Sequence, residues 1–338
     1  MASFNNSATH PTSNSSSPSP QCTDSEDTTL NIALSILFVL VFPCALILNG
    51  MASWISLHLK STSTFIVYLK NLVAADLLMT LTLPLMGASL QPGITVELRA
   101  FTCRYSDVIF YCALYTSIAL MGLISLDRFF KIVKPCGKSL GQNVMFSHVM
   151  SSLVWLILFG GTCIPTMILT DKPPPAGMSK NFCMELKSVH GLRLHGYVVL
   201  LMEAEFWFIC ALTVFCYIFI TVKVLQSFRN SGSNNSQGKK KTKLRVFLIL
   251  LVFFTCFVPL HIMRIPHTLQ EVYGCTQVWS EVLYKLSLWL STTNTCLDPL
   301  LYIFLCREYK NKLADMMKAR GISLCWWIDE KEKDNSTQ

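Results

Sequence analysis

The stretch LNIALSILFVLVFPCALILNGMASWISL, residues 30–57, decides the fold of this chain. It contains no Asp, Glu, Lys or Arg. About 20 apolar residues in a helix are enough to cross a hydrocarbon core about 30 Å thick. The stretch is therefore predicted to be a membrane-spanning helix.

Comparable apolar runs recur along the rest of the chain. They cover residues 65–86, 103–133, 145–169, 197–224, 244–265 and 278–306. Of all 338 residues, 52% are hydrophobic and only 14% are charged, which excludes a soluble domain with one anchor. The sequence predicts an all-α membrane protein, a bundle of seven transmembrane helices surrounded by membrane lipids. Asp76, Lys285 and Asp298 lie within these runs, where charges are costly enough to indicate function, although Lys285 is near a helix end and could reach the interface.

Basic side chains predict how the bundle is oriented. Short cytoplasmic loops are enriched in Lys and Arg. These residues flank the first, third and fifth connections: Lys60, Lys70, Arg128, Lys131, Lys134, Lys138, Arg229, Lys239, Lys240, Lys241 and Lys243. We therefore expect a multi-pass plasma-membrane protein with an extracellular N-terminus. Its net charge of +8 reflects topology, and no nucleic-acid partner is predicted.

The two ends of the chain differ from the apolar middle. Residues 1–29 have the Ser-, Thr-, Asn- and Pro-rich composition of a disordered segment, predicted to be extracellular, with glycosylation acceptors at Asn5 and Asn14. Residues 30–306 form the predicted seven-helix domain. In the cytoplasmic segment 307–338, apolar residues recur at helical spacing and basic residues separate them, which predicts a short eighth helix on the membrane surface.

Four of the 14 cysteines fall on the predicted outer face: Cys22, Cys103, Cys183 and Cys275. Disulfides persist on the oxidising side of a membrane. Four cysteines allow three pairings, and spacing alone does not choose among them.

Single polar, aromatic and proline residues recur in a fixed order through the runs. They are Asn49, Asp76, Asp127-Arg128-Phe129, Trp155, Pro259 and Asp298-Pro299-Leu300-Leu301-Tyr302. With these landmarks the chain resembles the rhodopsin-like (class A) G-protein-coupled receptors from Leu30 to about Arg320. The resemblance implies a receptor that activates a heterotrimeric G protein, and not an enzyme.

Arg128 is the predicted switch toward the G protein. It is a permanent cation at the inner end of the third run, where it can pair with Asp127 at rest and turn toward a partner on activation. Tyr217 and Tyr302 resemble the inner tyrosines that meet this arginine in the family's active state. The alternative is that Asp127 and Arg128 are a solvated helix end.

A second polar group comes from the second, third and seventh runs. Asp76, Ser117, Asn294 and Asp298 match residues that, in the resembled fold, meet in mid-membrane around water and a sodium ion. Oxygen ligands suit such a hard cation. A plain hydrogen-bond network is the other interpretation, and both can hold together. No cofactor is expected beyond this sodium ion.

Within the family, four strings are most similar to the purinergic branch that binds ADP and UDP-sugars. They are STFIVYLKN (63–71), GLISLDRF (122–129), CFVPLH (256–261) and CLDP (296–299). By that resemblance, Cys103 pairs with Cys183 and Cys22 with Cys275. The resemblance also implies coupling to the inhibitory class of G protein.

The ligand site is predicted at the outer mouth of the bundle, around Arg264. An anionic ligand needs fixed cations and hydrogen-bond donors there. The residues assigned to this site with Arg264 are Tyr111, Tyr115, Lys187, His195, His261 and Lys285.

Two features of this site depart from the nucleotide-binding relatives. Tyr284-Lys285 replaces an adjacent Lys and Glu, and Val199 replaces an asparagine.

A nucleotide or nucleotide sugar is the predicted ligand. A lysophospholipid or other anionic lipid, in a receptor of the same fold, is the alternative. A transporter or light-driven pump is disfavoured.

Overall fold

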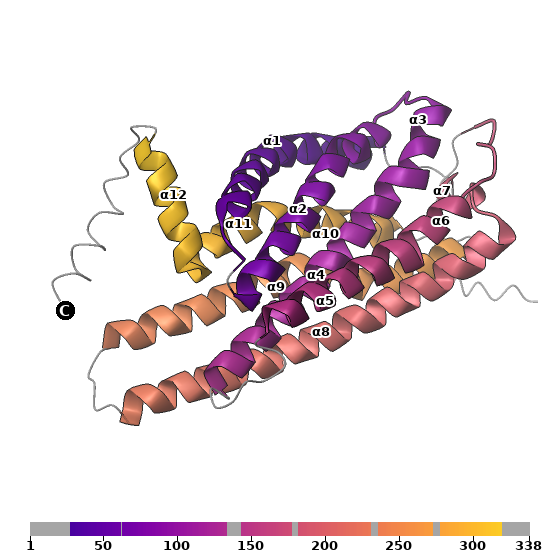
Figure 1. The fold of residues 1–338 in the computed structure, drawn as a ribbon. Coiled ribbons are helices and arrows are strands. Elements are labelled where there is room, and N and C mark those ends of the chain that lie inside the picture. The colour runs from indigo at the N-terminus through magenta and orange to yellow at the C-terminus, as the bar shows by residue number, and fades with distance from the viewer. Residues whose placement is uncertain are drawn as a thin grey trace, which may run out of the picture.

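The computed structural model describes residues 28–61, 63–133, 143–177, 182–230, 236–272 and 278–319, and these form helices joined by turns. Most of the helices run side by side in one bundle (Figure 1). The first two passes are α1 (Thr28–His58) and α2 (Thr64–Ser89). The third combines α3 (Val96–Phe101) with α4 (Asp107–Val133), and the fourth combines α5 (Val144–Trp155) with α6 (Ile164–Ile168). The fifth and sixth are α8 (Val189–Asn230) and α9 (Ser236–Val272).

Six segments of the described chain are long and apolar enough to cross a membrane, and the seventh pass is divided. It consists of α10 (Val278–Thr292) and α11 (Asn294–Leu305), with Thr293 between them. At about 1.5 Å per residue, neither piece alone spans a core of about 30 Å, but together they do.

Hydroxyl side chains and a proline explain this division. Ser291, Thr292 and Thr293 each donate to the carbonyl three residues earlier, at 2.6 to 2.7 Å, which weakens the helical ladder. Pro299 has no N–H to offer the carbonyl of Thr295. The Asn49 amide of α1 donates to that carbonyl instead, at 2.7 Å.

The bundle buries its interior and exposes its outer surface, as a lipid-solvated protein does. Leu40, Ile47 and Phe208 are 64%, 63% and 67% exposed. Inside, a cluster of buried residues from six passes includes Leu34, Met79, Phe110, Leu158, Phe206 and Phe257. A Cβ on Gly122 of α4 would lie 2.8 Å from Ile209 of α8, so glycine permits the close approach of these two helices.

The fifth pass is longer than its apolar run. Residues 197–224 contain no proline, and α8 is a continuous helix of 42 residues. It begins before residue 197 and continues past residue 224. Local widening occurs instead as π-helical turns at Thr102–Ser106 in the third pass and Leu156–Cys163 in the fourth.

The amphipathic segment forms α12 (Arg307–Ala319), which leaves the bundle at an angle (Figure 1). Tyr309 is buried, and Leu313 and Met316 pack on a cluster that includes Tyr68 and Tyr302. Burial raises the pKa of the Tyr309 phenol above its ordinary value. The apolar face of α12 therefore folds back onto the end of the bundle.

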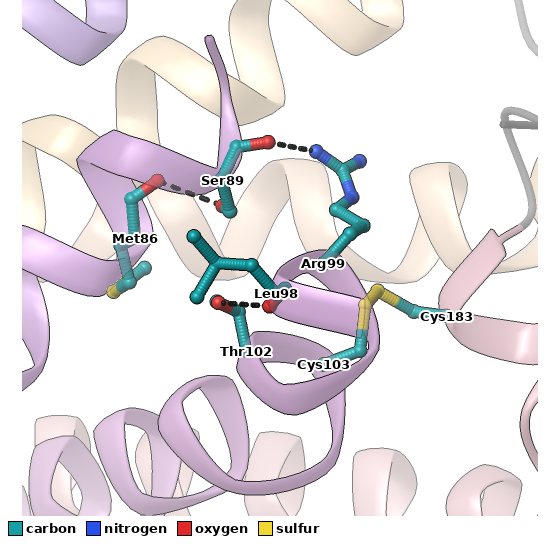
Figure 2. Close-up of a disulfide and its surroundings, with 7 residues drawn as sticks. All are labelled: Met86, Ser89, Leu98, Arg99, Thr102, Cys103 and Cys183. Carbon is teal, nitrogen blue, oxygen red and sulfur yellow. Dashed lines mark hydrogen bonds between the residues drawn. A yellow bond between two sulfur atoms is a disulfide. The ribbon is translucent and has the colours of Figure 1, made fainter. Parts of the chain in front are cut away.

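A disulfide joins Cys103 to Cys183 at the other end of the bundle, with the two Cα atoms 5.3 Å apart. It ties the loop helix α7 (Phe182–Glu185) to the start of the third pass. Figure 2 shows Arg99 beside it, donating to the Ser89 carbonyl at the end of α2. We call this the disulfide end, and the opposite end the Arg128 end.

Cys22, Cys275, Asn5 and Asn14 lie outside the described residues. Peptide mapping of the unreduced protein is expected to recover one crosslinked pair from Cys103 and Cys183, and a second from Cys22 and Cys275. A peptide joining Cys22 to Cys103 would contradict both pairings.

Candidate functional site

A cavity of about 280 Å³ opens at the disulfide end. Its apolar wall includes Leu34, Phe38, Val199, Met202 and Leu288. Its charged lining consists of four cations, Arg99, Lys187, Arg264 and Lys285, and two acids, Asp107 and Glu281. The excess of cations suits a ligand with an anionic end and an apolar or aromatic body.

Arg264 lies deep in this cavity and is 6% exposed. Its Nη1 donates to the Tyr115 hydroxyl at 2.9 Å, and its Cζ lies 4.4 Å from the centre of the Tyr111 ring. No carboxylate of the described residues is in ion-pair contact with it. Two tyrosines thus hold the guanidinium in place, one by a hydrogen bond and one by its ring face.

Lys285 also lines the cavity, but its charge is already paired. Its Nζ lies 2.6 Å from Glu281 Oε1 and donates to Asn31 Oδ1 of α1 at 2.9 Å. Glu281 and Lys285 are four residues apart on α10, so their side chains share one face. The ammonium therefore faces the first pass, and Tyr284 occupies the position toward the third.

Tyr284 closes one side of the cavity with aromatic contacts. Its hydroxyl bonds that of Tyr111 at 2.6 Å, and its ring stacks on His267 with centroids 4.0 Å apart. Three passes thus meet at one point. A tyrosine here supplies a hydroxyl and a ring face where a lysine would supply a charge.

Lys187 and His195 also line the cavity. Lys187 is only 4% exposed, so it is not a solvated loop charge. Arg99 of α3 and Asp107, at the start of α4, line the same cavity. This part of the lining therefore carries two cations and one acid.

His261 does not line the cavity, although the sequence assigned it to the ligand site. It is 1% exposed, and its ring stacks on Phe206 at 3.5 Å between centroids. Its Nδ1 lies 2.8 Å from the Phe257 carbonyl. Since it also meets the Tyr115 ring edge-on, it supports the wall behind Arg264.

Sequence reasoning missed several charged and aromatic residues here. Glu281 could have been found from its spacing to Lys285. Arg99, Asp107 and His267 carry no such signal, because the packing of different passes brings them to the cavity.

At the Arg128 end, the expected pair between Asp127 and Arg128 is wrong. The Asp127 carboxylate accepts a hydrogen bond from Thr64 and pairs with Lys131 at 2.9 Å. Arg128 lies over the Phe65 ring, 3.9 Å from its centroid. Adjacent residues point about 100° apart on a helix, whereas residues four apart share a face.

The two predicted switch tyrosines occupy different surroundings. Tyr217 is buried on α8. Tyr302 instead donates to Asp76 Oδ2 at 2.7 Å. In this conformation Tyr302 therefore belongs to the polar network.

The predicted polar network is assembled in the interior. Ser117 donates to Asp76 Oδ1 at 3.4 Å, and Asn294 donates to Asp298 Oδ2 at 2.7 Å. Asn294 Oδ1 is buried without a hydrogen-bond partner among the described residues. A free amide oxygen beside two buried carboxylates fits a hard cation. Sodium binding stays a prediction that these residues support.

Comparison with known proteins agrees with this architecture. Residues 48–302 match the 7 transmembrane receptor (rhodopsin family). The chain therefore belongs to the rhodopsin family of seven-transmembrane, G-protein-coupled receptors, and it is a receptor rather than an enzyme.

The relatives include proteins named as purinoceptors. The chain is 36% identical to purinoceptor 13 of Homo sapiens over 313 residues, 91% of this chain and 88% of the relative. It is 38% identical to purinoceptor 14 of Bos taurus over 289 residues, 83% of this chain and 84% of the relative. G-protein coupled receptor 87 of Mus musculus is 37% identical over 289 residues, 83% of this chain and 79% of the relative.

Proposed function

We propose that this receptor binds an extracellular nucleotide or nucleotide sugar through Arg264 and activates a heterotrimeric G protein of the inhibitory class. The observation that carries the proposal is Arg264 itself, a buried cation in a cavity, held by two tyrosines and without a carboxylate partner among the described residues. Relatives named as purinoceptors support the ligand class.

The orientation follows from the same elements. The cavity and the Cys103–Cys183 disulfide are at one end, and a disulfide persists in an oxidising environment. Arg128 and α12 are at the other end. We therefore place the disulfide end and the N-terminus outside the cell, and the Arg128 end toward the G protein.

A lipid anion is the second candidate ligand. Val199 and Met202 are buried and contribute apolar surface to the cavity close to Arg264. That surface would suit an acyl chain as well as a sugar or base. In both cases the phosphate is expected at Arg264.

A screen separates the two ligands. Cells expressing the receptor are expected to lower their cyclic AMP when given ADP, UDP or UDP-glucose, and not when given lysophosphatidic acid. Untransfected cells provide the control. A response to the lipid alone would contradict the nucleotide proposal, and calcium release without a fall in cyclic AMP would contradict the inhibitory class.

A further inference from the structure

Asp107 is an acid of the cavity lining for which the binding of an anion gives no role. It is the first residue of α4, four residues after Cys103 on the third pass. One of its carboxylate oxygens lies within 4.8 Å of both sulfur atoms of the Cys103–Cys183 disulfide. A disulfide has no S–H and cannot donate a hydrogen bond. The group beside this carboxylate therefore leaves it unpaired.

The two cations that share this part of the lining do not pair with Asp107 either. Arg99 donates to the Ser89 carbonyl instead (Figure 2). In the part of the chain that the structure describes, no side chain is in ion-pair or hydrogen-bond contact with the Asp107 carboxylate. Asp107 is partly exposed, and Arg99 and Lys187 line the same cavity, so its carboxylate is expected to be ionised at neutral pH.

Helical geometry relates Asp107 to Arg264. Asp107, Tyr111 and Tyr115 follow one another at four-residue spacing, so they share one face of α4. The Cζ atom of Arg264 lies 4.4 Å from the centre of the Tyr111 ring and 5.3 Å from that of Tyr115. At 1.5 Å per residue, Asp107 is about 6 Å beyond Tyr111 toward the disulfide end. An unpaired acid thus stands roughly one helical turn from the arginine that holds no carboxylate.

A ligand that satisfies both groups carries opposite charges at a matching separation. Its anion at Arg264 and an ammonium at Asp107 would each form a charge-assisted hydrogen bond. A phosphoethanolamine group has this form, since one oxygen and two carbons separate its phosphorus from its nitrogen. A divalent cation fits Asp107 less well, because it needs several oxygen ligands and the cations of the lining repel a double charge twice as strongly.

We propose that Asp107 is an ammonium-binding subsite, and that the receptor prefers zwitterionic ligands whose phosphate is bound by Arg264 and whose ammonium is bound by Asp107. This rests on the part of the proposed function that places the anion of the ligand at Arg264. A nucleotide and a lipid can both carry such a group, as CDP-ethanolamine and lysophosphatidylethanolamine do. The subsite selects them over analogues that carry the phosphate alone.

Purified full-length receptor provides the test, with ligand binding followed by thermal stabilisation in the presence of EDTA. CDP-ethanolamine is compared with CDP-glycerol, and lysophosphatidylethanolamine with lysophosphatidylglycerol. Within each pair the phosphodiester is the same, and an ammonium is exchanged for hydroxyl groups. We expect the ammonium-bearing member of at least one pair to reach half-saturation at an about tenfold lower concentration, which corresponds to about 1.4 kcal/mol.

Asp107→Asn removes the charge, keeps the size, and is expected to abolish this preference. Glu97→Gln is the matched control. Glu97 is an exposed acid of α3 at the same end of the bundle, and it does not line the cavity. We expect this control to bind all four probes as the wild type does. Asp107→Ser serves if Asp107→Asn does not fold.

Each other result overturns the inference. Equal binding within both pairs, an unchanged preference in Asp107→Asn, a lost preference in Glu97→Gln, or no binding of any probe would do so. A preference that appears only with added magnesium would show that Asp107 holds a metal ion instead. If the lipid pair alone binds and shows the preference, the nucleotide proposal is wrong and the ammonium subsite stands.

Discussion

Replacing Arg264 with alanine is expected to raise the agonist concentration for half-maximal response at least tenfold, which corresponds to about 1.4 kcal/mol. Arg264 is a cation of the cavity lining with no described carboxylate in ion-pair contact, and two tyrosines hold it in place. Its removal deletes a charge-assisted bond to the ligand and leaves the Tyr115 hydroxyl without its donor. Dose–response curves for cyclic AMP inhibition, at matched surface expression, provide the measurement.

Lys285→Met is the matched control, because Lys285 lines the same cavity but is paired with Glu281. We expect less than a threefold change, because little of its positive charge is left for the ligand. An equal loss in both variants would show that the net charge of the cavity matters more than the placement of Arg264. A normal dose response for Arg264→Ala would show that Arg264 does not bind the ligand.

Replacing Arg128 with alanine is expected to abolish G-protein activation while the receptor still reaches the cell surface and binds ligand. The guanidinium packs on Phe65 and forms no pair with Asp127, so it can turn toward a partner without breaking that ion pair. The measurement is nucleotide exchange on purified G protein, together with surface labelling.

The control for that variant is Lys131→Ala, which removes a cation about one turn further along α4. Lys131 pairs with Asp127 and is therefore a support rather than a contact for the G protein. We expect most of the signalling to remain. Full nucleotide exchange by Arg128→Ala would show that the switch lies elsewhere.

The sequence predicted the seven passes because burial in a membrane acts on every residue of a span. An apolar run such as 30–57 satisfies this requirement whatever its neighbours are. The boundaries were less predictable. α8 continues beyond its apolar run, since a helix does not need apolar residues once it leaves the hydrocarbon core.

Candidate site residues were predictable where a charged residue type stands inside an apolar run. Arg264 and Asp76 are charges inside apolar runs, and such charges need a partner or a purpose. Pairing partners were not predictable in the same way. Asp127 selects Lys131 rather than its neighbour Arg128 because of helical geometry, and His261 turns behind the cavity to stack on Phe206.

The sequence by itself thus predicted a seven-pass receptor with basic residues gathered at one end and Arg264 near the other, because hydropathy and charge are properties of single residues. Only the tertiary structure decided how Lys285 and Arg264 are partnered. Lys285 is paired with Glu281 and Asn31, whereas Arg264 is held by Tyr111 and Tyr115. The physical reason is that the energy of an ion pair or hydrogen bond depends on the distance between its two groups. Where the groups lie on different passes, the packing of the helices sets that distance.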